Sequence, residues 1–112
     1  MKIKTEEFTG SSPISFKDSI NYSDNAIVSK QVIKKSAGNI TLFAFDKGQE
    51  LSEHTAPFDA LVQVLEGEAR ISIDKKAYRL REGSCIIMPA GIPHALHASA
   101  RFKMLLTMIK SE

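Results

Sequence analysis

The sequence from Ile40 to Lys110 is a series of short apolar runs separated by turn residues, and this pattern restricts the possible folds more than any other feature. The runs are ITLFAFD, FDALVQVLEG, EARISID, KAYRLREG, SCIIMPAG, PHALHASA and RFKMLLTMIK. Period-two alternation and frequent β-branched residues favour strands over helices. Only the last run, through MLLTMI, is also compatible with a helix. Many short strands at this spacing predict an all-β sandwich or barrel.

The length of 112 residues suits one domain, and the composition, 43% hydrophobic and 25% charged, is that of an ordinary globular protein. Residues 1–36 are more polar and are predicted to form an N-terminal arm of the same domain, with short strands around Ile14–Phe16 and Ile27–Ile33. Residues 37–112 would form the barrel. Because an isolated strand is marginally stable, the arm must add to a sheet of its own subunit or of a neighbour.

The charge distribution and the single cysteine limit the possible partners. Fifteen basic and thirteen acidic residues give a formal charge of +2, so nucleic acid is not an expected partner. No segment approaches the roughly 18 apolar residues of a membrane helix, and the N-terminus lacks the apolar core of a signal peptide. Cys85 lies in the apolar run CIIM and is expected to be a buried, reduced thiol. These features favour a cytoplasmic location.

Two segments, 48–67 and 83–98, carry glycines, a proline and histidines at defined spacings. They resemble the paired motifs of the cupin superfamily, which read G-x5-H-x-H-x3,4-E-x6-G and G-x5-P-x-G-x2-H-x3-N. The residues in register are Gly48, His54, Gly67, Gly83, Pro89, Gly91 and His94. The resemblance implies a small single-domain cupin, a double-stranded β-helix or jelly-roll barrel with an N-terminal strand arm.

The resemblance also identifies a reduced metal site. The family's four usual ligands correspond here to His54, Ala56, Ala60 and His94, and Ala98 replaces the asparagine that often ends the second motif. Transition metals usually need at least three protein ligands to compete with water. The predicted metal residues are therefore His54 and His94 alone. Any metal would be a weakly held divalent ion (Mn, Fe, Ni or Zn), and otherwise no cofactor is expected.

Other polar residues near the motifs are poor substitutes for the missing ligands. Asp59 has the wrong strand parity unless a bulge shifts the register, and His97 and Gln63 also fall on the opposite face. Glu50 and Glu53 are expected in a solvated loop.

These observations favour a cupin that binds a small molecule in its barrel. The two alanines would open volume in an interior lined by Val62, Val64 and Leu96. One alternative is a metal-dependent enzyme, dioxygenase-like or isomerase-like, in which substrate or water completes the shell of His54 and His94. Another is a non-catalytic structural or interaction module. The missing ligands weigh against the usual cupin catalysis, and no nucleophile motif is present.

A homodimer is the expected assembly. The apolar runs DALVQVLEG and FKMLLTMI leave more hydrophobic surface than a small barrel can bury. The resemblance agrees, since small cupins often pair through sheet surfaces with an N-terminal strand crossing to the partner, and residues 14–33 would fit that use.

Overall fold

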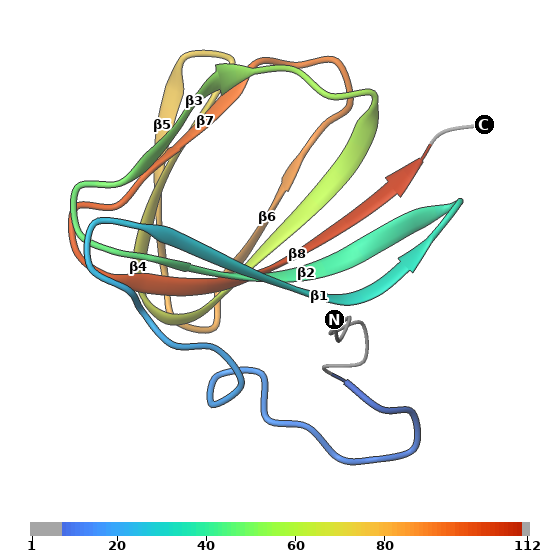
Figure 1. The fold of residues 1–112 in the computed structure, drawn as a ribbon. Helices are drawn as coiled ribbons and strands as arrows, with labels where there is room; N and C mark the ends of the chain where they lie inside the picture. The colour runs from blue at the N-terminus through green and yellow to red at the C-terminus, as the bar shows by residue number, and fades with distance from the viewer. Residues whose placement is uncertain (1–7, 111–112) are drawn as a thin grey trace.

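The computed structural model describes residues 8–110, which form an eight-stranded antiparallel β-barrel with no helix in that range (Figure 1). The strands are β1 (Ile27–Lys35), β2 (Gly38–Phe45), β3 (Glu50–His54), β4 (Phe58–Ile73), β5 (Lys76–Arg81), β6 (Cys85–Met88), β7 (His94–His97) and β8 (Phe102–Lys110). Accordingly, no helix of this part of the chain could span a membrane. The jelly-roll architecture predicted from the sequence is confirmed.

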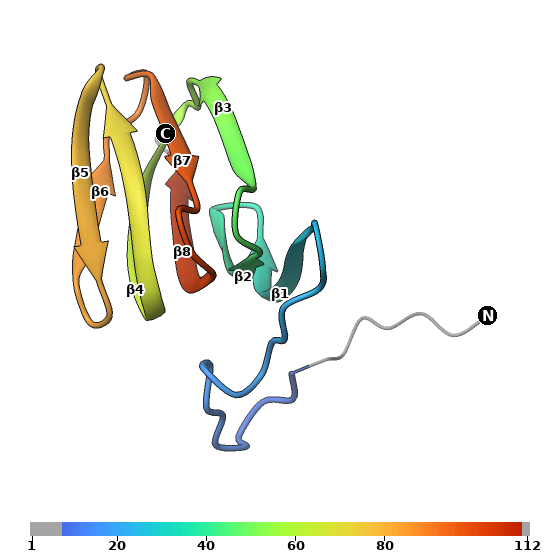
Figure 2. The same cartoon turned by 90° about the vertical axis from the view of Figure 1, so that its left-hand side faces the viewer.

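The long strand β4 belongs to both sheets of the barrel. Its first part pairs with β8 and β6, and its last part, from Glu68, pairs with β5 and β7. The first sheet continues through β8 to β2 and β1, and the second through β7 to β3. Figure 1 shows β3, β5 and β7 facing β1, β2 and β8 across the curled sheet. Figure 2 shows β4 between its neighbours β5 and β7.

Gly67 allows β4 to change sheets. Its φ of 80° lies in the left-handed region, and the pairing with β8 shifts register between Val64 and Glu66. A Cβ at this position would collide with the carbonyl oxygen of Arg101. Only glycine has neither the conformational penalty nor the clash.

One end of the barrel is closed by aromatic packing. Phe45 and Phe102 lie opposite each other on β2 and β8, and both are fully buried. Their rings stack with centroids 4.5 Å apart and an interplanar angle of 15°. Nearby, Gly48 N donates to the carbonyl oxygen of Ala98 over 2.7 Å, which joins the start of the first motif to the end of the second. This region is called the closed end below.

Residues 8–26 of the N-terminal arm pack on the outer face of their own sheet and lie below the barrel in Figure 1. Ile20 is fully buried against Leu42 and Ala44 of β2. The expected strand near Ile27–Ile33 is present as β1, whereas the one at Ile14–Phe16 is wrong. Ile14 and Ser15 have no regular structure and Phe16 begins a turn, because the backbone bonds locally and the Ser and Asp side chains bond nearby groups instead of a neighbouring strand.

Three other local expectations need correction or refinement. Glu50 and Glu53 lie in the strand β3 and not in a loop, since β3 pairs with β7 while its charged side chains stay in water. The last run is a strand, because β8 pairs with both β2 and β4. Cys85 is exposed and not buried, because the alternation of β6 turns Ile86 inward and Cys85 outward.

Candidate functional site

Two histidines meet at the end of the barrel opposite the closed end, here called the mouth. His54 is the last residue of β3 and His94 the first of β7, and the two lie opposite each other in the β3–β7 pairing. Their ring centroids are 4.4 Å apart, with the rings inclined at 69°. The structure therefore brings together the two predicted metal residues. That they bind a metal remains a prediction.

Backbone hydrogen bonds fix the orientation of both imidazoles. His54 Nδ1 lies 2.8 Å from the carbonyl oxygen of Ser52, and His94 Nδ1 lies 3.1 Å from that of Ile92. A carbonyl only accepts, so in each ring Nδ1 carries the hydrogen and donates it. In the neutral ring Nε2 then keeps its lone pair, and this arrangement is typical of histidines that bind a ligand through Nε2.

The two histidines differ in exposure. His54 is exposed at the rim, whereas His94 is only 5% exposed. Burial lowers the pKa of His94 below its usual value, the hydrogen bond to the Ile92 carbonyl opposes this shift, and the nearby His54 adds to it. His94 is therefore neutral at pH 7, and its Nε2 is available to bind a ligand.

A small, mostly apolar cavity of about 60 Å³ lies behind the histidines. Ala56 and Ala60 line it at the positions of the two absent ligands. The expectation that these alanines open volume in the interior agrees with this cavity, although the volume is small and methionine side chains share its lining. The residues lining the cavity are Leu51, His54, Ala56, Ala60, Met88, His94, Leu96, Met104, Leu106 and Met108.

None of the candidate replacement ligands reaches the histidine pair. Asp59 is exposed, and its Oδ1 accepts a hydrogen bond from Ala90 N at 2.9 Å. His97 Nδ1 pairs with Glu50 Oε1 at 3.1 Å, and Glu53 lies 3.5 Å from Lys75 Nζ. Gln63 lies opposite Cys85 on the outer face. The parity arguments made for Asp59, His97 and Gln63 therefore hold.

This donor set does not fit the divalent metal implied by the family motif. Within residues 8–110, no three His, Cys, Asp or Glu side chains are placed to share a metal ion. Two imidazoles, one exposed at the rim and one buried, leave a divalent ion short of ligands and of compensating negative charge.

Three methionines that line the cavity were not identified as candidate site residues from the sequence. Met88, Met104 and Met108 all have inward strand parity, and in register Met88 and Met108 flank Ala60 from the two neighbouring strands. The alternation of the runs SCIIMPAG and RFKMLLTMIK contained this signal, but only the pairing of β4 with both β6 and β8 places Met88 and Met108 beside Ala60.

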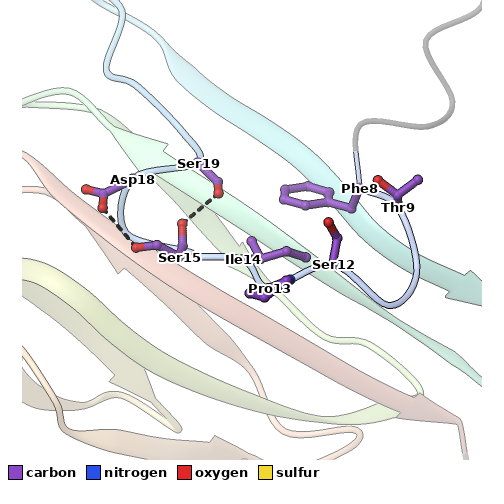
Figure 3. Close-up of a pocket in the computed structure, with 8 residues that line it drawn as sticks. All are labelled: Phe8, Thr9, Ser12, Pro13, Ile14, Ser15, Asp18 and Ser19. Atoms are coloured by element: carbon purple, nitrogen blue, oxygen red, sulfur yellow. Dashed lines mark hydrogen bonds between the residues drawn. The ribbon is translucent and has the colours of Figure 1, made fainter.

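A larger hollow of about 320 Å³ lies in the N-terminal arm, away from the histidines (Figure 3). Three of the polar side chains that line it already have hydrogen-bond partners: Ser15 Oγ donates to Asp18 Oδ2 over 3.0 Å, and Ser19 Oγ donates to the Ser15 carbonyl over 2.6 Å. The hollow is open and these groups are already paired, so the mouth is the better candidate site.

Comparisons with known proteins agree with this architecture. A family model described as "Cupin domain" matches residues 41–109. A conserved protein of unknown function from Streptococcus pyogenes is 39% identical, with a TM-score of 0.89 over 95% of this chain and 93% of that one. A cupin superfamily protein from Desulfitobacterium hafniense is 27% identical, with a TM-score of 0.88 over 95% and 97%.

A cupin 2 conserved barrel domain protein from Leptotrichia buccalis is 39% identical, with a TM-score of 0.81, and the match covers 84% of this chain but only 46% of that one. The comparison with curated proteins gave no match. The family model covers more than half of the chain, and its range contains both motifs and both histidines. The chain therefore belongs to the cupin family.

Proposed function

We propose that this cupin is a binding protein that holds a compact ligand, a single ion or a molecule of a few atoms, at its mouth through His54 and His94. One observation supports this most strongly: two imidazoles 4.4 Å apart, both with Nδ1 bonded to a backbone carbonyl, border the same apolar cavity. Such pre-oriented donors can bind without reorganisation.

The cavity limits the size of the ligand. Sites for drug-sized molecules occupy about 300–1,000 Å³. A cavity of about 60 Å³ admits only an ion or a few heavy atoms, with any larger part of the ligand left outside the mouth. The lining offers no carboxylate, so the two imidazoles are its only polar side chains.

The experiment is to identify what co-purifies with the protein. Untagged protein prepared without chelator would be denatured and its released metals and small molecules measured by mass spectrometry. His54→Ala and His94→Ala would be compared with His97→Ala, which removes an imidazole outside the mouth. We expect a species bound to wild type and to His97→Ala that is lost from the other two variants. Identical contents in all four proteins would contradict the proposal.

We also propose that two copies of the chain pair through one outer sheet face. A cross-strand row runs over five strands of that face, with each member opposite the next in register: Ile33, Ile40, Thr107, Leu61 and Ile87. Ile33 is 47% exposed and Ile87 is 61% exposed, and Ile109 beside the row is 62% exposed. No residue of the row is charged, and the exposed apolar surface of the row extends beyond a single isolated side chain.

The same face has the shape needed for two-fold pairing. A hollow of about 260 Å³ lies at the β1–β2–β8 end of the row, with Ile33, Ile40 and Ile109 in its lining, and the exposed pair of Leu61 and Ile87 lies at the other end. In an isologous dimer, the pair of one copy fills the hollow of the other, and the reverse.

Light scattering after size exclusion at micromolar concentration tests this pairing. Wild type should be a dimer and Ile87→Lys a monomer, because the lysine would place a charge in the interface. Ile14→Lys is the matched control, since Ile14 is an exposed isoleucine in the arm, outside the row. A monomeric wild type, or a dimeric Ile87→Lys, would contradict the pairing.

A further inference from the structure

Two methionines occupy the part of the mouth where the family's glutamate is absent. Met88 and Met108 lie directly opposite Ala60 on its two neighbouring strands, so the three form one row across β6, β4 and β8. Directly opposed side chains have Cβ atoms about 4.5–5.5 Å apart. Ala60, between them, carries only a methyl group, and all three side chains line the cavity.

The methionines and the histidines border the same cavity. Met88, Met108, His54 and His94 all line it, and Met88 and His94 are only 3% and 5% exposed. The side-chain donors that line the cavity are two imidazoles and the thioethers of Met88, Met108 and the more deeply placed Met104. None of these groups carries a negative charge.

We infer that the mouth is a binding site for monovalent copper, held by Nε2 of His54 and His94 and by the sulfurs of Met88 and Met108. This inference rests on the proposed function and names the ligand of that site. Thioether sulfur is a soft donor that selects Cu(I), whereas Zn, Fe and Mn prefer imidazole, thiolate or oxygen ligands.

Charge supports the same choice of ion. The cost of moving an ion out of water into a medium of low dielectric constant grows with the square of its charge. Neutral ligands give no compensating negative charge, and the lining of the cavity contains no carboxylate. A monovalent ion is therefore far less penalised here than a divalent one, and the small volume suits one ion bound directly by side chains.

The competing explanation is that the methionines only fill the core, because methionine adapts well to irregular gaps. Met104 provides the matched control. It lines the same cavity and is fully buried, but it lies opposite Val64, further toward the closed end and away from Ala60. Met88→Leu, Met108→Leu and Met104→Leu nearly conserve volume, a kind of substitution that protein cores tolerate, so all three variants should fold.

The test is anaerobic titration with Cu(I) against a chromogenic Cu(I) chelator, with X-ray absorption at the copper edge to detect sulfur neighbours. Wild type should bind one Cu(I) with sulfur in its shell. Met88→Leu and Met108→Leu should each weaken binding by about tenfold or more, since even the loss of an outer partner of a metal ligand costs about 10–100-fold. Met104→Leu should bind as wild type does.

Two results would overturn the inference: wild-type Cu(I) affinity in both Met88→Leu and Met108→Leu, or a copper shell without sulfur. A histidine-dependent ligand that co-purifies while Cu(I) fails to bind would refute the copper assignment and leave the proposed function intact. Cu(I) binding that survives both His54→Ala and His94→Ala would refute the assigned site and the role proposed for the histidines.

Discussion

The two ends of the barrel differ in the side chains that fill them. At the closed end, Phe45 and Phe102 stack at 4.5 Å, both fully buried. At the mouth, the same strand β8 contributes Met108, which borders a cavity beside the two histidines. Large rigid side chains fill one end, while small and flexible ones leave space at the other.

This difference explains how a cupin can lose half of its usual ligand set and keep its fold. Gly67 and the aromatic stack lie outside the mouth, and the strand pairing is made by the backbone and not by the side chains of the missing ligands. Ala56 and Ala60 therefore change what the site can bind without removing an interaction that the fold requires. The predictions below test this separation between stability at one end and binding at the other.

The largest effect is expected at the closed end. Phe102→Ala removes a fully buried ring and leaves a cavity, so the free energy of unfolding should fall by about 3–5 kcal/mol. Urea unfolding followed by circular dichroism measures the loss. A cost below about 1 kcal/mol would show that the stack contributes little and that the comparison of the two ends is wrong.

Substitution of Gly67 should have the next largest effect. Gly67→Ala places a side chain at φ 80° and against the Arg101 carbonyl, and the strain alone should cost about 1–3 kcal/mol. Gly48→Ala is the matched control, because Gly48 also has a positive φ, 87°, but its Cβ would have no atom within 4 Å. We expect Gly67→Ala to be the more destabilised. Equal losses of stability in Gly67→Ala and Gly48→Ala would show that the close approach of the Arg101 carbonyl is not what makes glycine necessary at position 67.

A salt-bridge network should make the closed end sensitive to acid. Arg101 Nε donates to Asp46 Oδ1 over 2.7 Å, and the hydrogen bond from Arg101 is the main reason that the pKa of Asp46 falls from 3.8 to about 2. Because the folded pKa is the lower one, this stabilisation is fully present above pH 3.8 and is lost as the pH falls toward 2.

Asp46→Asn tests this acid dependence. The stability difference between wild type and Asp46→Asn should be largest above pH 3.8 and should shrink below it, as measured by urea unfolding across that range. A difference that stays constant through the range would contradict the assignment.

The smallest effect on stability is expected at the mouth. His54 is exposed, and its ring bonds only to a nearby carbonyl, so His54→Ala should change the free energy of unfolding by no more than about 0.5 kcal/mol. The same variant should lose the co-purified ligand. A large loss of stability in ligand-free His54→Ala would mean that the mouth supports the fold.

The sequence was most informative where periodicity and turn residues act locally. Alternation predicted the strands that became β2, β4, β5, β6, β7 and β8, and the glycine and proline spacings led to the cupin barrel. The strand at Ile14–Phe16 was wrong, because its serines and Asp18 hydrogen-bond within a local turn. The burial of Cys85 was wrong, because an apolar run does not reveal which face of a strand is covered.

Only part of the candidate site could be identified from the sequence. His54 and His94 could be identified because the motif fixes their positions along the chain. The methionines could not, since their meeting around Ala60 depends on which strands are neighbours, and β4 pairs with β6 and β8 over a large separation in sequence. Long-range register is a property of the whole sheet and not of any one segment.

The most direct test of the central claim is nitrogen NMR of the histidine rings, recorded with and without Cu(I) under anaerobic conditions. We expect His54 and His94 both to be protonated at Nδ1 in the free protein. At one equivalent of copper, the Nε2 resonances of these two rings should shift together, while those of His97 should not. A shift confined to one ring, or the same shift at His97, would contradict a site built from the paired histidines of the mouth.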